Sequence, residues 1–268
     1  MSDGVATGYR EIRLVVAGPV AELVLARPAA RNAMTDAMGA EVAHAVAAIN
    51  ASATVRVVLM RGEGEAFSAG GDFAMLAQRA RATPDENRVA MRGFYASFLT
   101  VRALRVPTVA VIAGSAIGAG LCLAMACDLR LAASHVKLAA SFVRVGLHPG
   151  MGATWLLPRL VGPAIAAELL LTGRAIDAAE ALRIGLVNQV HAAEALDGAA
   201  WALARELAAA APLAVARTKA TLAGALERTM DDALACEAEA QALDFGTADL
   251  GEALQAAAER RAPTFRGS

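Results

Sequence analysis

The spacing of apolar positions changes along the chain, from short alternating elements in the first part to almost continuous helical periodicity in the rest. Short apolar runs predict strands, and apolar positions three or four residues apart predict helices. The predicted strands cover residues 13–18 and 20–26 (a hairpin), 55–60, 106–113, 129–132 and 136–139; the predicted helices cover 35–50, 121–126 and a segment through Phe94, Phe98 and Val101. From Gly162 onward the pattern is helical. This order is typical of an α/β fold with a helical C-terminal part.

Two glycine-rich segments, residues 61–72 and 114–120, each follow one of the predicted buried strands. If these strands run parallel, both segments lie at one edge of the sheet, where α/β folds bind ligands. The second segment leads into a helix, so free N–H groups and the positive end of the helix dipole face whatever binds there. Two such N–H groups can hold one ligand oxygen. For either segment alone, a tight strand-to-helix turn is the simpler interpretation. A charged stretch, residues 78–88, follows the first segment and is expected to be mobile.

Positive and negative charges nearly cancel, with 25 Lys and Arg against 26 Asp and Glu. This balance argues against a nucleic-acid-binding protein, which would carry a basic excess. The mean hydropathy of +0.46 raises a membrane-spanning interpretation for residues 106–127, an apolar run long enough to cross a bilayer. Pro107 and a cluster of glycines would weaken a helix through this run. We therefore expect a soluble protein without a membrane partner. Because residues 1–10 include Asp3 and lack an apolar run, we expect no signal peptide and a cytoplasmic location.

The three cysteines, Cys122, Cys127 and Cys236, stand in apolar surroundings without a CxxC pair or a histidine at metal-ligand spacing. We expect free, mostly buried thiols in a reducing compartment, and no metal site. A dinucleotide cofactor is not indicated either, because Leu123 stands where the glycine-rich fingerprint begun by Gly118 requires its third glycine.

Several longer motifs follow one another in a recognisable order. They are residues 26–34 (ARPAARNAM), 66–73 (AFSAGGDF), 107–120 (PTVAVIAGSAIGAG), 126–133 (ACDLRLAA), 145–162 (VGLHPGMGATWLLPRLVG), 170–190 (LLTGRAIDAAEALRIGLVNQV) and 260–265 (RRAPTF). In these motifs the chain resembles the crotonase (enoyl-CoA hydratase/isomerase) superfamily, and the resemblance covers nearly its whole length.

The resemblance implies a crotonase-type spiral of ββα units over residues 1–200, and a helical part over 201–268 that does not fold independently and assembles trimers or hexamers. It also implies an acyl-CoA thioester substrate, with coenzyme A as part of the substrate rather than a separate cofactor. The family's oxyanion-hole positions fall on the N–H groups of Gly71 and Ala119, and the substrate-binding loops also contain Ala69 and Asp72. Fixed donors of this kind lower the barrier to a thioester enolate.

The chain departs from the family at three positions that usually hold acids. Cys122 stands where hydratases have Glu, three residues after the second oxyanion donor. Phe142 stands where hydratases and many isomerases have Glu, and Gly150 where several isomerases and dehalogenases have Asp or Glu. Removing a general acid or base typically lowers a rate by about 10²–10⁴-fold. Hydration by a pair of glutamates is therefore not expected here.

Other residues are candidates for moving protons. His148 lies on a Gly/Pro loop, where functional residues concentrate, although a structural role is an alternative. Cys122 is either a base with a pKa lowered by the helix start or a small packed residue. Asp72 either holds a water molecule or organises its loop, and Phe142 is a candidate wall for a bulky acyl group. Two functions stay open: an enoyl-CoA hydratase/isomerase-type enzyme with an unusual proton carrier, or a CoA-thioester-binding protein with little or no turnover.

The phosphates of coenzyme A need cations, and the chain has only two lysines. We expect Arg27 and Arg31 to bind them, with Arg261 or Arg260 reaching in from the C-terminal part of a neighbouring subunit; ordinary surface charges are the alternative. The Ala-rich helical C-terminal third leaves apolar faces that one chain would not cover, which favours a homotrimer or homohexamer.

Overall fold

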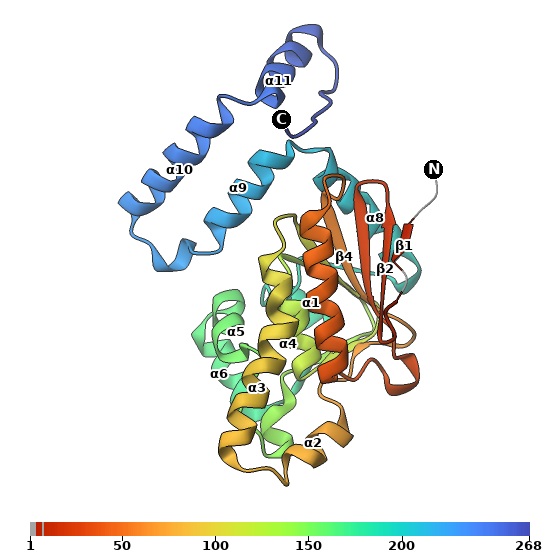
Figure 1. The fold of residues 1–268 in the computed structure, drawn as a ribbon. Coiled ribbons are helices and arrows are strands. Elements are labelled where there is room, and N and C mark those ends of the chain that lie inside the picture. Colours follow the sequence, from red (N-terminus) through yellow and green to blue (C-terminus); the bar gives the residue numbers. More distant parts are fainter. Residues whose placement is uncertain (1–3, 7) are drawn as a thin grey trace.

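A computed structural model describes residues 4–6 and 8–268 of the chain. The expectation for residues 1–10 therefore lies partly outside the described residues. Figure 1 shows strands and helices packed together in one layered part, from which the last three helices project. The predicted α/β architecture with a helical C-terminal part is therefore present.

The N-terminal hairpin forms as predicted. Strands β2 (Ile12–Ala17) and β3 (Val20–Leu25) pair antiparallel, with Ala17 opposite Val20. Gly18 has a φ of 59°, a conformation that glycine adopts without steric cost, so the turn residue explains the register. A short strand β1 (Gly4–Ala6) pairs with β2.

Two sheets form the centre of the described structure. The larger has the order β1-β2-β3-β4-β6-β8-β11 and is parallel from β3 onward, through β4 (Val57–Gly62), β6 (Thr108–Ile112), β8 (Leu129–Ala133) and β11 (Gln189–His191). The smaller has the order β10-β9-β7-β5, with β10 (Ala175–Asp177), β9 (Lys137–Ala139), β7 (Ser115–Ile117) and β5 (Ala66–Ser68). The central strands β4 and β6 read as continuous apolar runs because both of their faces are covered.

Helices cover these sheets. Helix α1 (Asp36–Ala51) begins where the Thr35 side chain accepts a hydrogen bond from the Met38 amide, and it packs along α3 (Pro84–Leu99) (Figure 1). Helix α8 (Ala193–Ala209) packs on β4, β6 and β8. The remaining helices are α2 (Phe73–Arg79), α4 (Ala119–Ala126), α5 (Ala153–Val161), α6 (Pro163–Thr172), α7 (Ala178–Arg183), α9 (Pro212–Leu222), α10 (Met230–Asp244) and α11 (Ala248–Glu259), with short 3-10 helices at Pro28–Ala30, Thr100–Ala103, Ser141–Val145 and Ala225–Glu227.

Some short elements differ from the prediction. Strands β5 and β7 lie inside the segments predicted as glycine-rich loops, and β10 and β11 lie in the region predicted as helical. Each has only three residues, too few for a periodic pattern to distinguish a strand from a loop or a helix end. The charged stretch 78–88, expected to be mobile, instead includes the end of α2 and the capped start of α3.

The apolar run 106–127 is not a single helix. It contains β6, β7 and α4 in succession, so the membrane-spanning interpretation of this run is wrong. Among the described residues no single helix is both long and apolar enough to cross a bilayer; one pair, α8 with the segment Pro212–Glu227, passes by length and composition only and is bent by 106°.

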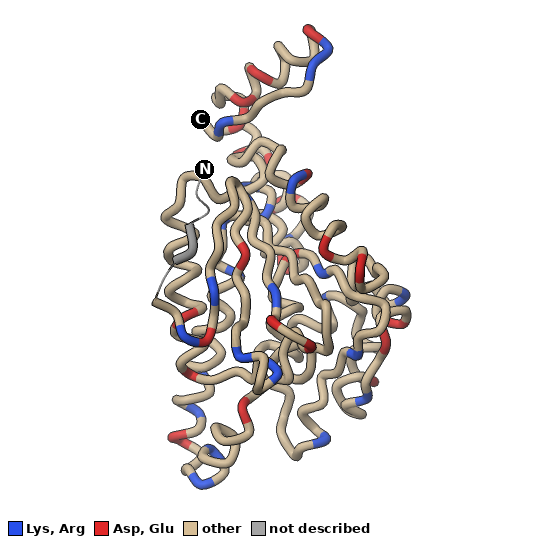
Figure 2. Tube along the Cα trace, turned by 90° about the vertical axis from the view of Figure 1, so that its right-hand side faces the viewer, with Lys and Arg blue, Asp and Glu red and all other residues tan. Residues whose placement is uncertain are grey.

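The C-terminal helices differ from the rest of the molecule. Figure 1 shows α9, α10 and α11 extending away from the sheets. The expected division at residue 200 falls inside α8, whose Leu196, Ala200 and Ala204 are buried, so the helical extension begins after this helix. Figure 2 shows basic and acidic residues interspersed along the chain, in keeping with the near-zero net charge.

Candidate functional site

The two glycine-rich segments meet at one edge of the smaller sheet. Strands β5 and β7 are parallel neighbours, with Ala66 opposite Ser115 and Ser68 opposite Ala116. The chain leaves both strands at the same end and enters α2 after the first and α4 after the second. The predicted buried strands that precede the segments, β4 and β6, are parallel neighbours as well, so the expectation of a common edge is confirmed.

Glycines allow the two segments to touch. A Cβ atom on Gly70 would lie 2.7 Å from the Ile117 carbonyl oxygen and 3.5 Å from the Ala119 amide nitrogen. A Cβ atom on Gly120 would lie 2.6 Å from both the Cβ and the carbonyl oxygen of Ser68. Because real side chains do not tolerate such contacts, only glycine permits this approach. The loop that contains Gly71 is thereby held against the start of α4.

Two backbone donors at this junction have no partner within the described part of the chain. Both neighbours of Gly71 form hydrogen bonds with Met34. The Met34 N–H donates to the Gly70 carbonyl oxygen at 2.7 Å, and the Asp72 N–H donates to the Met34 carbonyl oxygen at 3.0 Å. The N–H of Gly71 is left out of this pairing. Ala119 is the first residue of α4, so its N–H precedes the first intrahelical bond, which Cys122 makes to Gly118. The junction therefore presents free donors at a helix start, an arrangement suited to a negatively charged oxygen.

Asn32 holds the first loop in place. The side chain is fully buried, its Oδ1 accepts from the Arg27 N–H at 2.9 Å, and its Nδ2 donates to the carbonyl oxygens of Glu63 and Ala66 at 2.9 and 2.8 Å. Ser68 Oγ donates to the Asn32 carbonyl at 2.8 Å. The roles of Asn32 and Ser68 in positioning the loop were not predicted from the sequence, although Asn32 belongs to the motif at residues 26–34. A buried amide satisfied on both of its ends is a contact pattern that only the fold reveals.

Asp72 organises its loop, which is one of the two roles expected for this residue. Its Oδ1 accepts from the amides of Ala74 and Met75, which caps α2, and its Oδ2 accepts from Arg27 Nη1 at 3.1 Å. Burial by itself would raise the pKa of Asp72, but the hydrogen bonds from Arg27, Met75 and Ala74 outweigh it and lower the pKa. The carboxylate is therefore ionised at neutral pH and serves as a fixed cap.

Cys122 has the environment of a small packed residue, one of the two interpretations that its sequence position allowed. Its side chain is fully buried and its Sγ donates to the Gly150 carbonyl oxygen at 3.5 Å. Burial raises the pKa of Cys122 well above its usual range, so the alternative interpretation, a base with a pKa lowered by the helix start, is wrong. Enclosure in apolar surroundings outweighs the helix dipole, and the thiol stays neutral at physiological pH.

Two of the other candidates, Phe142 and His148, lie on the segment after β9. Phe142 is half-buried and packs against the core from the 3-10 helix Ser141–Val145, whereas His148 is exposed. Ala69 lies in the first loop and is exposed, and its N–H donates to the Arg31 carbonyl oxygen at 2.9 Å. The roles expected for Phe142, His148 and Ala69 stay predictions.

The structure does not gather the three predicted phosphate ligands within one chain. The Arg27 guanidinium is already engaged by Asp72 and the Ala33 carbonyl. Arg31 is exposed, and its side chain makes no ion pair with any described residue. Arg261 forms ion pairs with Glu252 and Glu259 just after α11, and Figure 1 places α11 at the opposite end of the molecule from α2.

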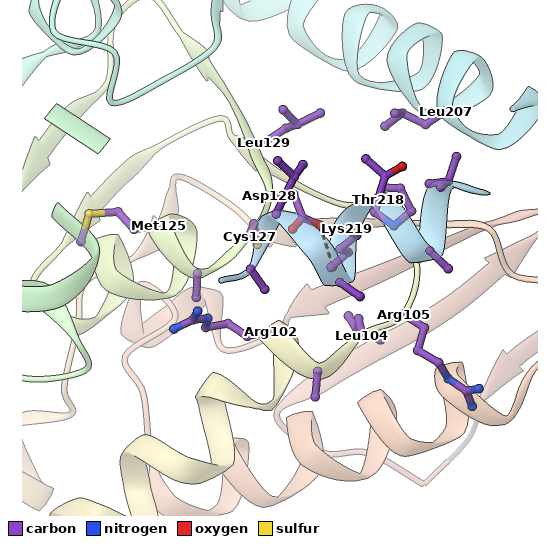
Figure 3. Close-up of a pocket in the computed structure, with 18 of the residues that line it drawn as sticks. Arg102, Leu104, Arg105, Met125, Cys127, Asp128, Leu129, Leu207, Thr218 and Lys219 are labelled. Atoms are coloured by element: carbon purple, nitrogen blue, oxygen red, sulfur yellow. Dashed lines mark hydrogen bonds and ion pairs between the residues drawn. The ribbon is translucent and has the colours of Figure 1, made fainter. Parts of the chain in front are cut away.

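A cavity of about 840 Å³ lies elsewhere, between the α/β part and α9. Figure 3 shows Asp128 and Lys219 within it, joined by an ion pair of 2.7 Å. None of the predicted catalytic residues lines this cavity. Its size therefore does not make it the site of the predicted chemistry. Among the residues that the structure describes, no group of three or more His, Cys, Asp or Glu is placed to hold a metal ion.

Comparison with known proteins decides the family. Residues 16–268 match the family model described as enoyl-CoA hydratase/isomerase. The chain belongs to this family. Its relatives include the crotonyl-CoA hydratase of Syntrophomonas wolfei, 37% identical over 96% of this chain and 98% of the relative, and the human enoyl-CoA hydratase domain-containing protein 2, mitochondrial, 36% identical over 99% and 93%.

Solved structures of the enoyl-CoA hydratase/isomerase family share the fold. A putative enoyl-CoA hydratase from Streptomyces coelicolor superposes with a TM-score of 0.93 at 35% identity, covering 98% of this chain and 96% of the other. The enoyl-CoA hydratase of Bacillus anthracis gives 0.91 at 32% identity, covering 97% and 100%. The predicted fold class and the prediction of an enzyme of this family are confirmed. The match extends through the helical C-terminal part.

Proposed function

We propose that this enoyl-CoA hydratase/isomerase family member binds an acyl-CoA thioester and stabilises its enolate between the N–H groups of Gly71 and Ala119. The observation that carries the proposal is the junction of two glycine-rich loops with both of these donors free. The names of the relatives, among them crotonyl-CoA hydratase, support a CoA thioester as the substrate class.

The chemistry follows from where charge develops. Removing an α-proton, or adding water to an α,β-unsaturated thioester, moves negative charge onto the thioester carbonyl oxygen. A donor fixed at that oxygen contributes about 2.7–4 kcal/mol to the stability of such a transition state. The hydrogen bonds of the Asn32 side chain to Glu63 and Ala66 hold the loop that contains Gly71, and the start of α4 holds Ala119. The two donors therefore need no reorganisation during the reaction.

Coenzyme A is part of the substrate in this proposal, and no separate cofactor is required. Arg31 is the best-placed phosphate ligand of one chain, since it is exposed and forms no ion pair with any described residue. Arg27 serves the same site indirectly by fixing Asp72. We expect the reaction to take place in the cytoplasm, in a homotrimer or homohexamer whose neighbouring chain brings Arg261 toward the CoA.

Removing one donor tests the oxyanion hole directly. Proline is tolerated at the first position of a helix, so Ala119→Pro deletes one N–H with little disturbance of α4. We expect the variant to incorporate deuterium at the α- or γ-carbon of enoyl-, dienoyl- or aryl-acyl-CoA thioesters in D2O about 10²–10³-fold more slowly than the unaltered chain. Mass spectrometry of the recovered thioesters gives the rate.

The matched control is Ala193→Pro, the same change at the exposed first position of α8. It should leave the exchange rate unchanged. Equal rates in the Ala119→Pro and unaltered chains would contradict the oxyanion hole. Tight binding of CoA thioesters without exchange in the unaltered chain would instead support the alternative function, a CoA-thioester-binding protein, which the lack of acids at Cys122, Phe142 and Gly150 favours.

A further inference from the structure

The space beside Gly150 is occupied by a tyrosine from another helix. A Cβ atom on Gly150 would collide with Tyr95 Oη and lie 3.0 Å from Tyr95 Cζ. Tyr95 belongs to α3, which packs on α4, and its ring meets that of Phe94 edge to face. Any side chain larger than hydrogen at residue 150 would displace the phenol. The glycine and the tyrosine are therefore matched in shape.

The Tyr95 hydroxyl is available to a ligand. The residue is half-buried, and its oxygen makes no hydrogen bond with any described residue. The oxygen is not completely buried, so it is partly accessible from outside the chain. A half-buried phenol usually finds a partner. Here the partner can come from outside the chain.

The hydroxyl lies next to the helix that carries an oxyanion donor. Cys122 follows Ala119 by one helical turn, and its Sγ bonds the carbonyl of the same Gly150 that faces Tyr95. Burial raises the pKa of Tyr95, so the phenol keeps its proton at neutral pH. The buried, neutral thiol offers no competing charge at this point.

We propose that Tyr95 is a catalytic residue whose hydroxyl delivers the proton to the carbon chain of the thioester held at Gly71 and Ala119. This inference rests on the proposed function of that site. It assigns to a phenol on α3 the proton transfer for which Cys122, Phe142 and Gly150 provide no carboxylate.

Atoms and electrons balance in this proton transfer with water as the only other reactant. When water adds to the β-carbon, its oxygen lone pair forms the C–O bond and the C=C π pair takes the Tyr95 proton to form the α-C–H bond. The electron pair of the broken Tyr95 O–H bond stays on the phenolic oxygen and accepts a proton from the attacking water. Tyr95 ends neutral, as it began.

Tyr95→Phe tests the step because it removes only the hydroxyl. We expect deuterium incorporation at the α-carbon in D2O to fall about 10²–10⁴-fold while the dissociation constant of the same thioester, measured by calorimetry, stays within a few-fold. Tyr9→Phe is the matched control: Tyr9 is the only other tyrosine, and its hydroxyl pairs with His44 at 2.9 Å. This control should retain the full rate.

A second variant restores a proton carrier in the same space. Tyr95→Ala clears the collision at Gly150, whose backbone has no positive φ, so Tyr95→Ala with Gly150→Asp places a carboxyl group there. We expect the double variant to incorporate deuterium at least tenfold faster than Tyr95→Ala alone. Equal rates for these two variants would contradict the proposal.

The outcomes separate this inference from the function on which it rests. Exchange that survives Tyr95→Phe but is lost in His148→Ala would overturn the role of Tyr95 and leave the oxyanion hole intact. An unaltered chain that binds thioesters but exchanges no proton with any of them would overturn both.

Discussion

Helices α4 and α10 are both rich in alanine, yet they have opposite environments. All eight residues of α4 are buried, from Ala119 to Ala126, whereas α10 has no buried residue among its fifteen. Both sequences favour a helix, since alanine has the highest helix propensity. The difference lies in the partners: α4 is enclosed by β5, β6, β7, α3 and α5, and α10 makes its main contacts with α9. Composition thus predicts that each segment forms a helix, but whether other elements bury that helix depends on the tertiary fold.

The uncovered helices still carry large apolar side chains. Seven are exposed between α9 and α11, at Leu222, Leu226, Met230, Leu234, Leu243, Phe245 and Leu254. Large apolar side chains that are exposed together on one part of a protein are typical of interaction surfaces. The same kind of side chain that is buried in α4 is exposed in the C-terminal helices, where we expect it to contact neighbouring chains.

The largest expected effect is on assembly. We expect the unaltered chain to have the mass of a trimer or hexamer by light scattering at micromolar concentration. Leu226→Glu combined with Met230→Glu should shift the mass toward that of one chain, because the residues are 72% and 73% exposed in the single chain and buried carboxylates without partners are costly. Val89→Glu, on the exposed face of α3, is the control and should keep the mass. A monomeric unaltered chain would contradict the expectation.

The next largest effect is expected when a glycine in the buried helix α4 is compared with a glycine in the exposed helix α11. Gly120→Ala places a Cβ 2.6 Å from Ser68 in the packed junction, so we expect a loss of about 1–3 kcal/mol in the free energy of unfolding and a slower exchange reaction. Gly251→Ala in α11 meets no atom within 4 Å and should stabilise the protein by about 0.4–1 kcal/mol, because alanine restricts the unfolded chain. Thermal unfolding at one protein concentration measures both. Shifts of the same sign would show that the regions do not differ in packing.

The sequence was sufficient for the long elements of the fold. The hairpin, α1, β4, β6 and α4 follow from periodicity and from cap residues such as Thr35. The three-residue strands β5, β7, β10 and β11 do not, because tertiary pairing rather than local pattern defines them. The motifs identified the family, but periodicity alone would not have done so.

The part of the candidate site that consists of backbone N–H groups could be predicted from the sequence. The glycines that bring Gly71 and Ala119 together are visible as sequence motifs. The contacts of Asn32 and the position of Tyr95 beside Gly150 join segments far apart in the chain, and no spacing in the sequence indicates them. The choice between the two interpretations of Cys122 stayed open for the same reason, since burial by distant segments, which raises its pKa, outweighs its place near a helix start.

The smallest expected effect is on CoA binding, when one arginine in each region is replaced by alanine. Arg31 in the α/β part has no ion pair with any described residue, whereas Arg261 in the C-terminal part is held by Glu252 and Glu259. Arg31→Ala should weaken CoA binding up to about fivefold in calorimetry, the range of an exposed charge pair of about 0.2–1 kcal/mol, and the loss should shrink at high salt. Arg261→Ala should cost less, because its guanidinium must first leave two carboxylates to reach a phosphate on a neighbouring chain. A larger loss for Arg261→Ala than for Arg31→Ala would show that assembly rearranges these pairs and that the neighbouring chain supplies the main phosphate contact.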